Sequence, residues 1–115
     1  MTQEAIDRAT FRALQEAAGA DFVRDLVATF LDDEAPTMMA ELESALAAGD
    51  AERFRRAAHS LKSNSNTFGA VALGLVARDL ELSGLAAVTS RPRPLAPLAA
   101  EYERAAARLR EMARG

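Results

Sequence analysis

The chain has 115 residues, a formal net charge of −3, a single histidine and no cysteine. This length predicts one domain covering residues 1–115, and the lack of cysteine excludes disulfides, thiolate metal sites and a thiol nucleophile. One histidine excludes a multi-histidine metal site, so we expect no metal, and the acidic balance argues against a nucleic-acid partner. We find no signal-peptide pattern and no apolar run long enough to span a membrane, so we expect a cytoplasmic protein that does not enter a membrane.

Alanine dominates the composition, with 27 of the 115 residues, and it is the strongest intrinsic helix former. No segment alternates apolar and polar residues as a strand does, whereas apolar residues recur at helical spacing along most of the chain. We expect a short helix over Ile6–Ala18, ended by Gly19. A long helix with one apolar side is predicted over Asp21–Ala48, and we expect Pro36 to kink it rather than break it.

The middle of the chain predicts two more helices in quick succession. The pair Gly49-Asp50 can end the long helix and cap the next one, which runs over Ala51–Phe68 and is ended by Gly69. A further helix is predicted over Ala70–Ser83, with Gly84 closing it. Each of these helices carries apolar residues on one side only.

The segment Leu85–Pro94 is predicted to be a loop, because its proline-rich second half cannot sit inside a helix. The last helix begins near Pro94 or Leu95 and has the most regular apolar spacing in the chain. Four substantial helices, each apolar on one side, can bury those sides together only as a bundle. The predicted fold class is therefore all-α, an antiparallel four-helix bundle with a short additional N-terminal helix.

The only histidine, His59, falls about 140° from the apolar line of the helix Ala51–Phe68, so we expect it to be exposed. Helical spacing places four side chains beside it: Arg55, Lys62, Ser63 and Asn66. Neutral imidazole is a good nucleophile near neutral pH, and the ammonium of Lys62 could neutralise a phosphoryl group that the ring accepts. Singly, each of these residues is more simply interpreted as an ordinary solvated surface residue. Together they favour a phosphoryl-accepting site, because the sole lysine shares a face with the sole histidine.

Residues 58–70, with the sequence AHSLKSNSNTFGA, resemble the signature A-H-x-L-K-G-x-x-x-x-x-G-A of histidine-containing phosphotransfer (HPt) domains. The resemblance extends through most of the chain, over Phe22–Phe30, Ala45–Asp50 and Leu80-Glu81. Ser63 departs from the pattern, since glycine is commonest at that position. A serine is small enough to leave docking intact, and it could either bind the phosphoryl group or restrict the choice of partner.

The resemblance implies a function in a multistep phosphorelay. His59 would accept a phosphoryl group from a receiver-domain aspartate, or from a sensor or hybrid histidine kinase, and pass it to a response-regulator receiver. Lys62 would steady the phosphohistidine, Gly69 would end the helix in a tight turn, and Ser63 and Asn66 would support the site. We expect a monomer that acts as a phosphocarrier without kinase activity of its own. No cofactor is expected on this chain, and Mg²⁺ would be bound by the partner receiver domain.

The docking surface is expected around His59, on its own helix and the adjacent face of the preceding helix, with Thr37, Met38, Met39 and Arg55 as candidates. Two adjacent methionines cannot both face the core of a regular helix, so either one is exposed for docking or the kink at Pro36 lets both pack. A helical adaptor that docks receivers without being phosphorylated is the alternative function. A nucleic-acid-binding bundle is a third, which the net acidic charge disfavours.

Overall fold

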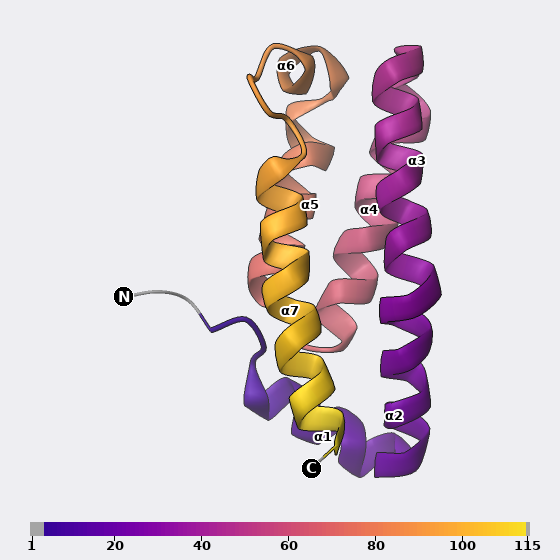
Figure 1. The fold of residues 1–115 in the computed structure, drawn as a ribbon, viewed down its shortest axis with the longest axis vertical. Helices are drawn as coiled ribbons and strands as arrows, with labels where there is room; N and C mark the ends of the chain where they lie inside the picture. Colours follow the sequence, from indigo (N-terminus) through magenta and orange to yellow (C-terminus); the bar gives the residue numbers. More distant parts are fainter. Residues whose placement is uncertain (1–3, 115) are drawn as a thin grey trace.

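The computed structural model describes residues 4–114, in which every regular element is helical. The elements in chain order are α1 (Arg8–Ala18), α2 (Ala20–Thr29), the π-helical η1 (Phe30–Glu34), α3 (Ala35–Ala48), α4 (Ala51–Thr67), α5 (Val71–Ser83), α6 (Leu85–Thr89) and α7 (Ala96–Arg114). The rod α2–η1–α3 lies beside α4, α5 and α7 in alternating directions, and α1 crosses the lower end of the bundle (Figure 1). The predicted all-α fold class is therefore confirmed.

The core lies along the bundle axis, where each long helix contributes buried apolar side chains. Phe30 and Phe68 pack with ring centroids 5.1 Å apart, which joins the start of η1 to the end of α4. The largest fully buried side chains come from all parts of the chain and include Phe11, Phe30, Phe54, Leu42, Leu61, Leu73, Leu80, Leu98 and Leu109. Burying one apolar side of each helix in this way accounts for the amphipathic spacing of the sequence.

The long helix predicted over Asp21–Ala48 stays helical across Pro36, and its irregularity lies one turn earlier, in η1. There Ala35 donates its N–H to the carbonyl of Phe30, five residues back. Proline has no N–H to offer, and the hydroxyl of Tyr102 on α7 donates instead to the carbonyl of Leu31, at 2.6 Å. The five-residue step keeps Phe30 and Ala35 on the core side, because one π-turn replaces one α-turn.

The prediction of a loop over Leu85–Pro94 is wrong in its first half, where α6 forms a short helix. Gly84, with φ of +83°, redirects the chain at the end of α5. Val88 is then fully buried, so a tertiary contact holds a helical turn that the local sequence does not demand.

The turn between α4 and α5 is held by Gly69, whose φ is +79°. Its carbonyl accepts the backbone N–H of Asp7 at 2.7 Å, which ties the segment before α1 to the end of α4. A Cβ at this position would lie 2.8 Å from the carbonyl oxygen of Asp7, so only glycine fits without a shift. This turn sets the antiparallel register in which α5 packs on α4.

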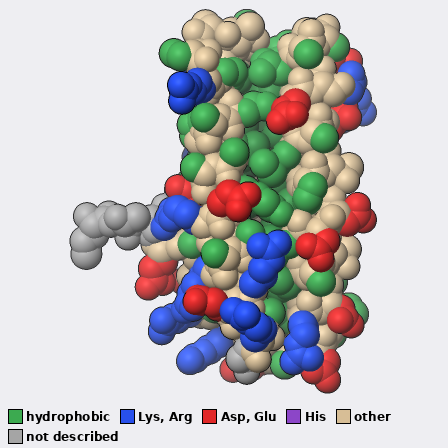
Figure 2. All heavy atoms as spheres, in the orientation of Figure 1, with side chains coloured by type: hydrophobic (Ala, Val, Ile, Leu, Met, Phe, Trp, Pro, Cys, Tyr) green, Lys and Arg blue, Asp and Glu red, His purple; other side chains and the backbone are tan. Residues whose placement is uncertain are grey.

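Figure 2 shows the face formed by α7 and α3, where apolar side chains follow the line between the helices and charged ones gather toward the lower end. No histidine is visible on this face, so the exposed His59 belongs to a different side of the bundle. Within the described part of the chain, no helix combines the length and the apolar character needed to cross a membrane.

Candidate functional site

Helix α4 places His59 on its solvent side. Phe54, Ala58 and Leu61 are buried on the opposite side, and Ser65 is buried with them because its hydroxyl donates to the carbonyl of Leu61 at 2.6 Å. The side chain of His59 is 54% exposed. An imidazole in this position can be reached by a second protein without any movement of the bundle.

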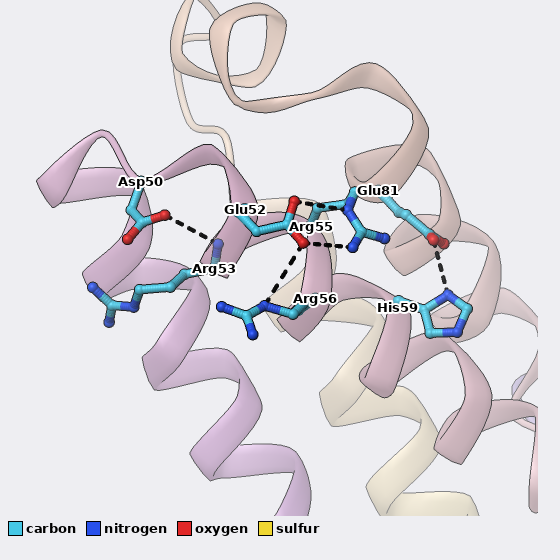
Figure 3. A network of polar contacts seen from close by, with 7 residues as sticks. All are labelled: Asp50, Glu52, Arg53, Arg55, Arg56, His59 and Glu81. Atoms are coloured by element: carbon cyan, nitrogen blue, oxygen red, sulfur yellow. Dashed lines mark hydrogen bonds and ion pairs between the residues drawn. The ribbon is translucent and has the colours of Figure 1, made fainter.

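A carboxylate on α5 joins the two residues that the sequence placed side by side. Oε2 of Glu81 lies 2.8 Å from Nδ1 of His59, and Oε1 of Glu81 lies 2.9 Å from Nζ of Lys62. The side chain of Glu81 is only 12% exposed, so this carboxylate is largely shielded by the groups that it binds. Figure 3 shows the imidazole turned toward Glu81.

The role of Glu81 was missed at the sequence level, where it appeared only within the Leu80-Glu81 pair of the family resemblance. Its contact with His59 joins residues 22 positions apart on different helices. Periodicity relates residues on one helix, and it cannot give the register between two helices.

The charge of Glu81 determines which nitrogen of His59 is free. Hydrogen bonding to Lys62, and secondarily to His59, holds the pKa of Glu81 below its ordinary value of 4.5, so this carboxylate is ionised at neutral pH. An ionised carboxylate only accepts hydrogen bonds, so Nδ1 of His59 must carry the proton. In the neutral ring Nε2 then holds the lone pair, and it makes no hydrogen bond within residues 4–114.

Small side chains surround the imidazole on its own side of α4. Ser63 and Asn66 are both exposed, one and two turns beyond His59. Asn66 packs directly over Gly74 of α5, where a Cβ would collide with Oδ1 of Asn66. No large side chain of Ser63 or Asn66 therefore projects beside His59, which leaves room for a partner to approach the ring.

Comparison with protein families matches residues 25–113 to the Hpt domain. The chain belongs to the Hpt domain family. A solved structure, histidine-containing phosphotransfer protein B (HptB) from Pseudomonas aeruginosa PAO1, is 28% identical to this chain. It superposes with a TM-score of 0.82, over 98% of this chain and 97% of that one. No curated protein matches this Hpt domain in sequence. Family membership identifies the chain as a histidine phosphotransfer protein.

The arginines beside the site of this Hpt domain are engaged in ion pairs along α4. Arg55 contacts Glu52 at 2.7 Å, and Arg56 lies 3.8 Å from the same carboxylate (Figure 3). Hydrogen bonding to Glu52 raises the pKa of Arg55 above its ordinary value. Arg55, a predicted docking residue, is thus half-exposed but paired with Glu52.

A shallow groove lies between α3 and α4, on the flank of α4 that is turned away from α5. Its lining residues are Thr37, Met38, Glu41, Arg53, Arg56, Ala57 and Ser60. Two predicted docking residues, Thr37 and Met38, therefore share a surface with the neighbour of His59. Met39 does not line the groove. Both methionines are half-buried and pack against the core.

No group of three or more histidine, aspartate or glutamate side chains that could hold a metal ion occurs in the part of the chain that the structure describes.

Proposed function

We propose that this Hpt domain carries phosphoryl groups between receiver domains on Nε2 of His59. The observation that supports the assignment is the hydrogen bond between Nδ1 and Glu81, because it leaves Nε2 as the nucleophile at the solvent side. A receiver domain that carries an aspartyl phosphate is the donor, or a histidine kinase in its place, and a second receiver is the acceptor. The domain would act as a cytoplasmic monomer.

The transfer step needs no base on this chain. Nε2 of His59 forms the N–P bond while the bond between phosphorus and the aspartate oxygen breaks, and the aspartate leaves as a carboxylate. The ring becomes cationic as Nε2 bonds to phosphorus, and its Nδ1 proton stays in the hydrogen bond to Glu81, whose charge offsets the cation. The reverse sequence returns the phosphoryl group to another receiver.

Lys62 supplies positive charge for the phosphoryl oxygens. Its ammonium lies 2.9 Å from the carboxylate that also binds His59, so it lies close to the ring, on a flexible stem. Phosphoryl transfer depends mainly on positioning and charge neutralisation. The Mg²⁺ that assists the transfer would be bound by the receiver domain, and Ser63, Asn66 and Gly69 would keep the approach open and the turn fixed.

The test is phosphotransfer from a radiolabelled phospho-receiver in the presence of Mg²⁺. The wild-type chain should acquire a label that is labile in acid and stable in base, as expected for phosphohistidine. His59→Gln should acquire none while keeping the same helical circular dichroism. A label that persists in His59→Gln contradicts the site, and a wild-type chain that binds receivers without being labelled favours an adaptor.

A further inference from the structure

Helix α5 carries an exposed apolar ridge next to the site. Leu82 is 67% exposed and Leu75 is 49% exposed, although most large apolar side chains of this bundle are buried. The two residues are seven positions apart, which places them on one side of the helix about 10 Å from each other. We define the ridge as Leu75, Arg78 and Leu82.

The ridge lies on the solvent side of α5, next to the side that faces α4, and its Leu75 also lines a groove with Pro94 and Pro97. Gly74 and Glu81, also seven apart, face α4, since one packs under Asn66 and the other binds His59. Leu75 and Leu82 each follow one of these residues directly, so they project about 100° further round the helix, toward solvent. Leu82 directly follows Glu81, which binds His59, so Leu82 and His59 lie at a similar position along the bundle axis.

Arg78 lies between the two leucines and is exposed. It makes no ion pair within residues 4–114, unlike Arg55 and Arg56 on the neighbouring helix. The ridge thus combines two apolar side chains with one guanidinium that has no carboxylate partner in the described chain. Such a surface suits an apolar patch that adjoins acidic groups.

We propose that the ridge is the α5 half of the receiver-docking surface, so that a receiver domain straddles α4 from the groove beside Met38 to Leu82. This inference rests on the proposed function. Transfer requires the receiver aspartate to approach Nε2 of His59 to about 3 Å. A specific interface covers about 800 Å² on each partner, which corresponds to a disc of about 16 Å radius around the contact. Leu82, adjacent to the residue that binds His59, falls within that disc.

The experiment measures transfer from a phosphorylated receiver as its concentration is varied, in single-turnover conditions. Leu82→Ser combined with Leu75→Ser should raise the half-saturating receiver concentration about tenfold. The rate at saturation should change little, because neither leucine touches the reacting atoms. The receiver used is the one that labels the wild-type chain fastest.

Phe22→Ser is the matched control. Phe22 is 56% exposed and belongs to α2, a helix that Figure 1 shows at the lower end of the bundle. The half-saturating concentration of this variant should equal that of the wild type. Circular dichroism checks that all variants are folded.

An unchanged half-saturating concentration in the double variant overturns the ridge assignment while leaving the proposed function intact. So does a wild-type dimer, seen by light scattering, that Leu82→Ser converts to a monomer, because a second copy would then cover the ridge. A wild-type chain that takes no label from any receiver overturns the proposed function, and this inference with it.

Discussion

At His59 the hydrogen bond to Glu81 assigns different tasks to the two ring nitrogens. Nδ1 is held by a carboxylate that Lys62 also binds, and Nε2 is left to react. The fixed tautomer needs no rearrangement when a partner arrives, which is the usual advantage of a preorganised nucleophile.

Glu81→Gln keeps the shape of this side chain but removes its charge. A neutral amide forms a weaker hydrogen bond than a carboxylate does, and it can bind either tautomer, so phosphorylation of His59 should slow about fivefold, or about 1 kcal/mol. Lys62→Ala should instead shorten the lifetime of the phosphohistidine. Single-turnover labelling and decay assays measure the two effects separately.

Glu52→Gln is the control, because Glu52 pairs only with arginines on α4. Its labelling rate should match that of the wild type. Equal rates in Glu81→Gln and wild type would show that Glu81 does not prepare the ring.

The sequence could predict the exposure of His59 and its nearness to Lys62, since both follow from spacing on one helix. It could not predict that Glu81 joins them. That contact depends on how α5 slides against α4, and this register is set by a turn and by core packing at a distance.

At the level of elements, the turn after α4 fixes that register. Gly69 needs its positive φ, and it also lies in contact with the backbone of Asp7. Gly49, after α3, has a similar φ of +69° but has no atom within 4 Å of the position that a Cβ would take. A side chain at Gly49 would therefore meet backbone strain alone, whereas a side chain at Gly69 would meet both strain and crowding.

Gly69→Ala should lower the free energy of unfolding by about 2–4 kcal/mol, because strain and a clash with Asp7 add. Gly49→Ala should cost about 1 kcal/mol from backbone strain alone. Urea unfolding followed by circular dichroism gives both values. Equal losses would mean that the segment around Asp7 moves aside freely.

Helix boundaries were largely predictable from apolar spacing and from the glycines, whereas η1 and α6 were not. Pro36 marked an irregularity, but its form depends on the hydroxyl of Tyr102, which lies far away in the sequence. Likewise α6 exists because Val88 finds a place in the core. Both features are imposed by tertiary packing rather than by local preference.

Over the whole molecule, several carboxylates are stabilised in their ionised form by basic partners. The pKa of Glu41 is lowered by Arg53, that of Glu52 by Arg55, and those of Asp79 and Glu81 mainly by Arg91 and Lys62. A carboxylate with a lowered pKa in the folded state stabilises the fold above its unfolded pKa. That contribution is lost as the pH falls through the folded value.

The urea midpoint should therefore fall as the pH is lowered from about 5 to 3. Part of this fall should be missing in Glu81→Gln, because the residue that replaces the carboxylate does not titrate. The measurement is a series of urea titrations at fixed ionic strength. A urea midpoint that rises as the pH is lowered from about 5 to 3 would contradict the contribution of these ion pairs.

The reacting groups His59, Lys62 and Glu81 lie on α4 and α5, whereas the groove beside Met38 draws three of its seven lining residues from α3. The proposed docking surface therefore lies on both sides of the reacting groups, with Thr37 and Met38 on α3 and the ridge on α5. Substitutions on α3 can therefore change the choice of partner while the residues of α4 and α5 that carry out phosphoryl transfer stay the same.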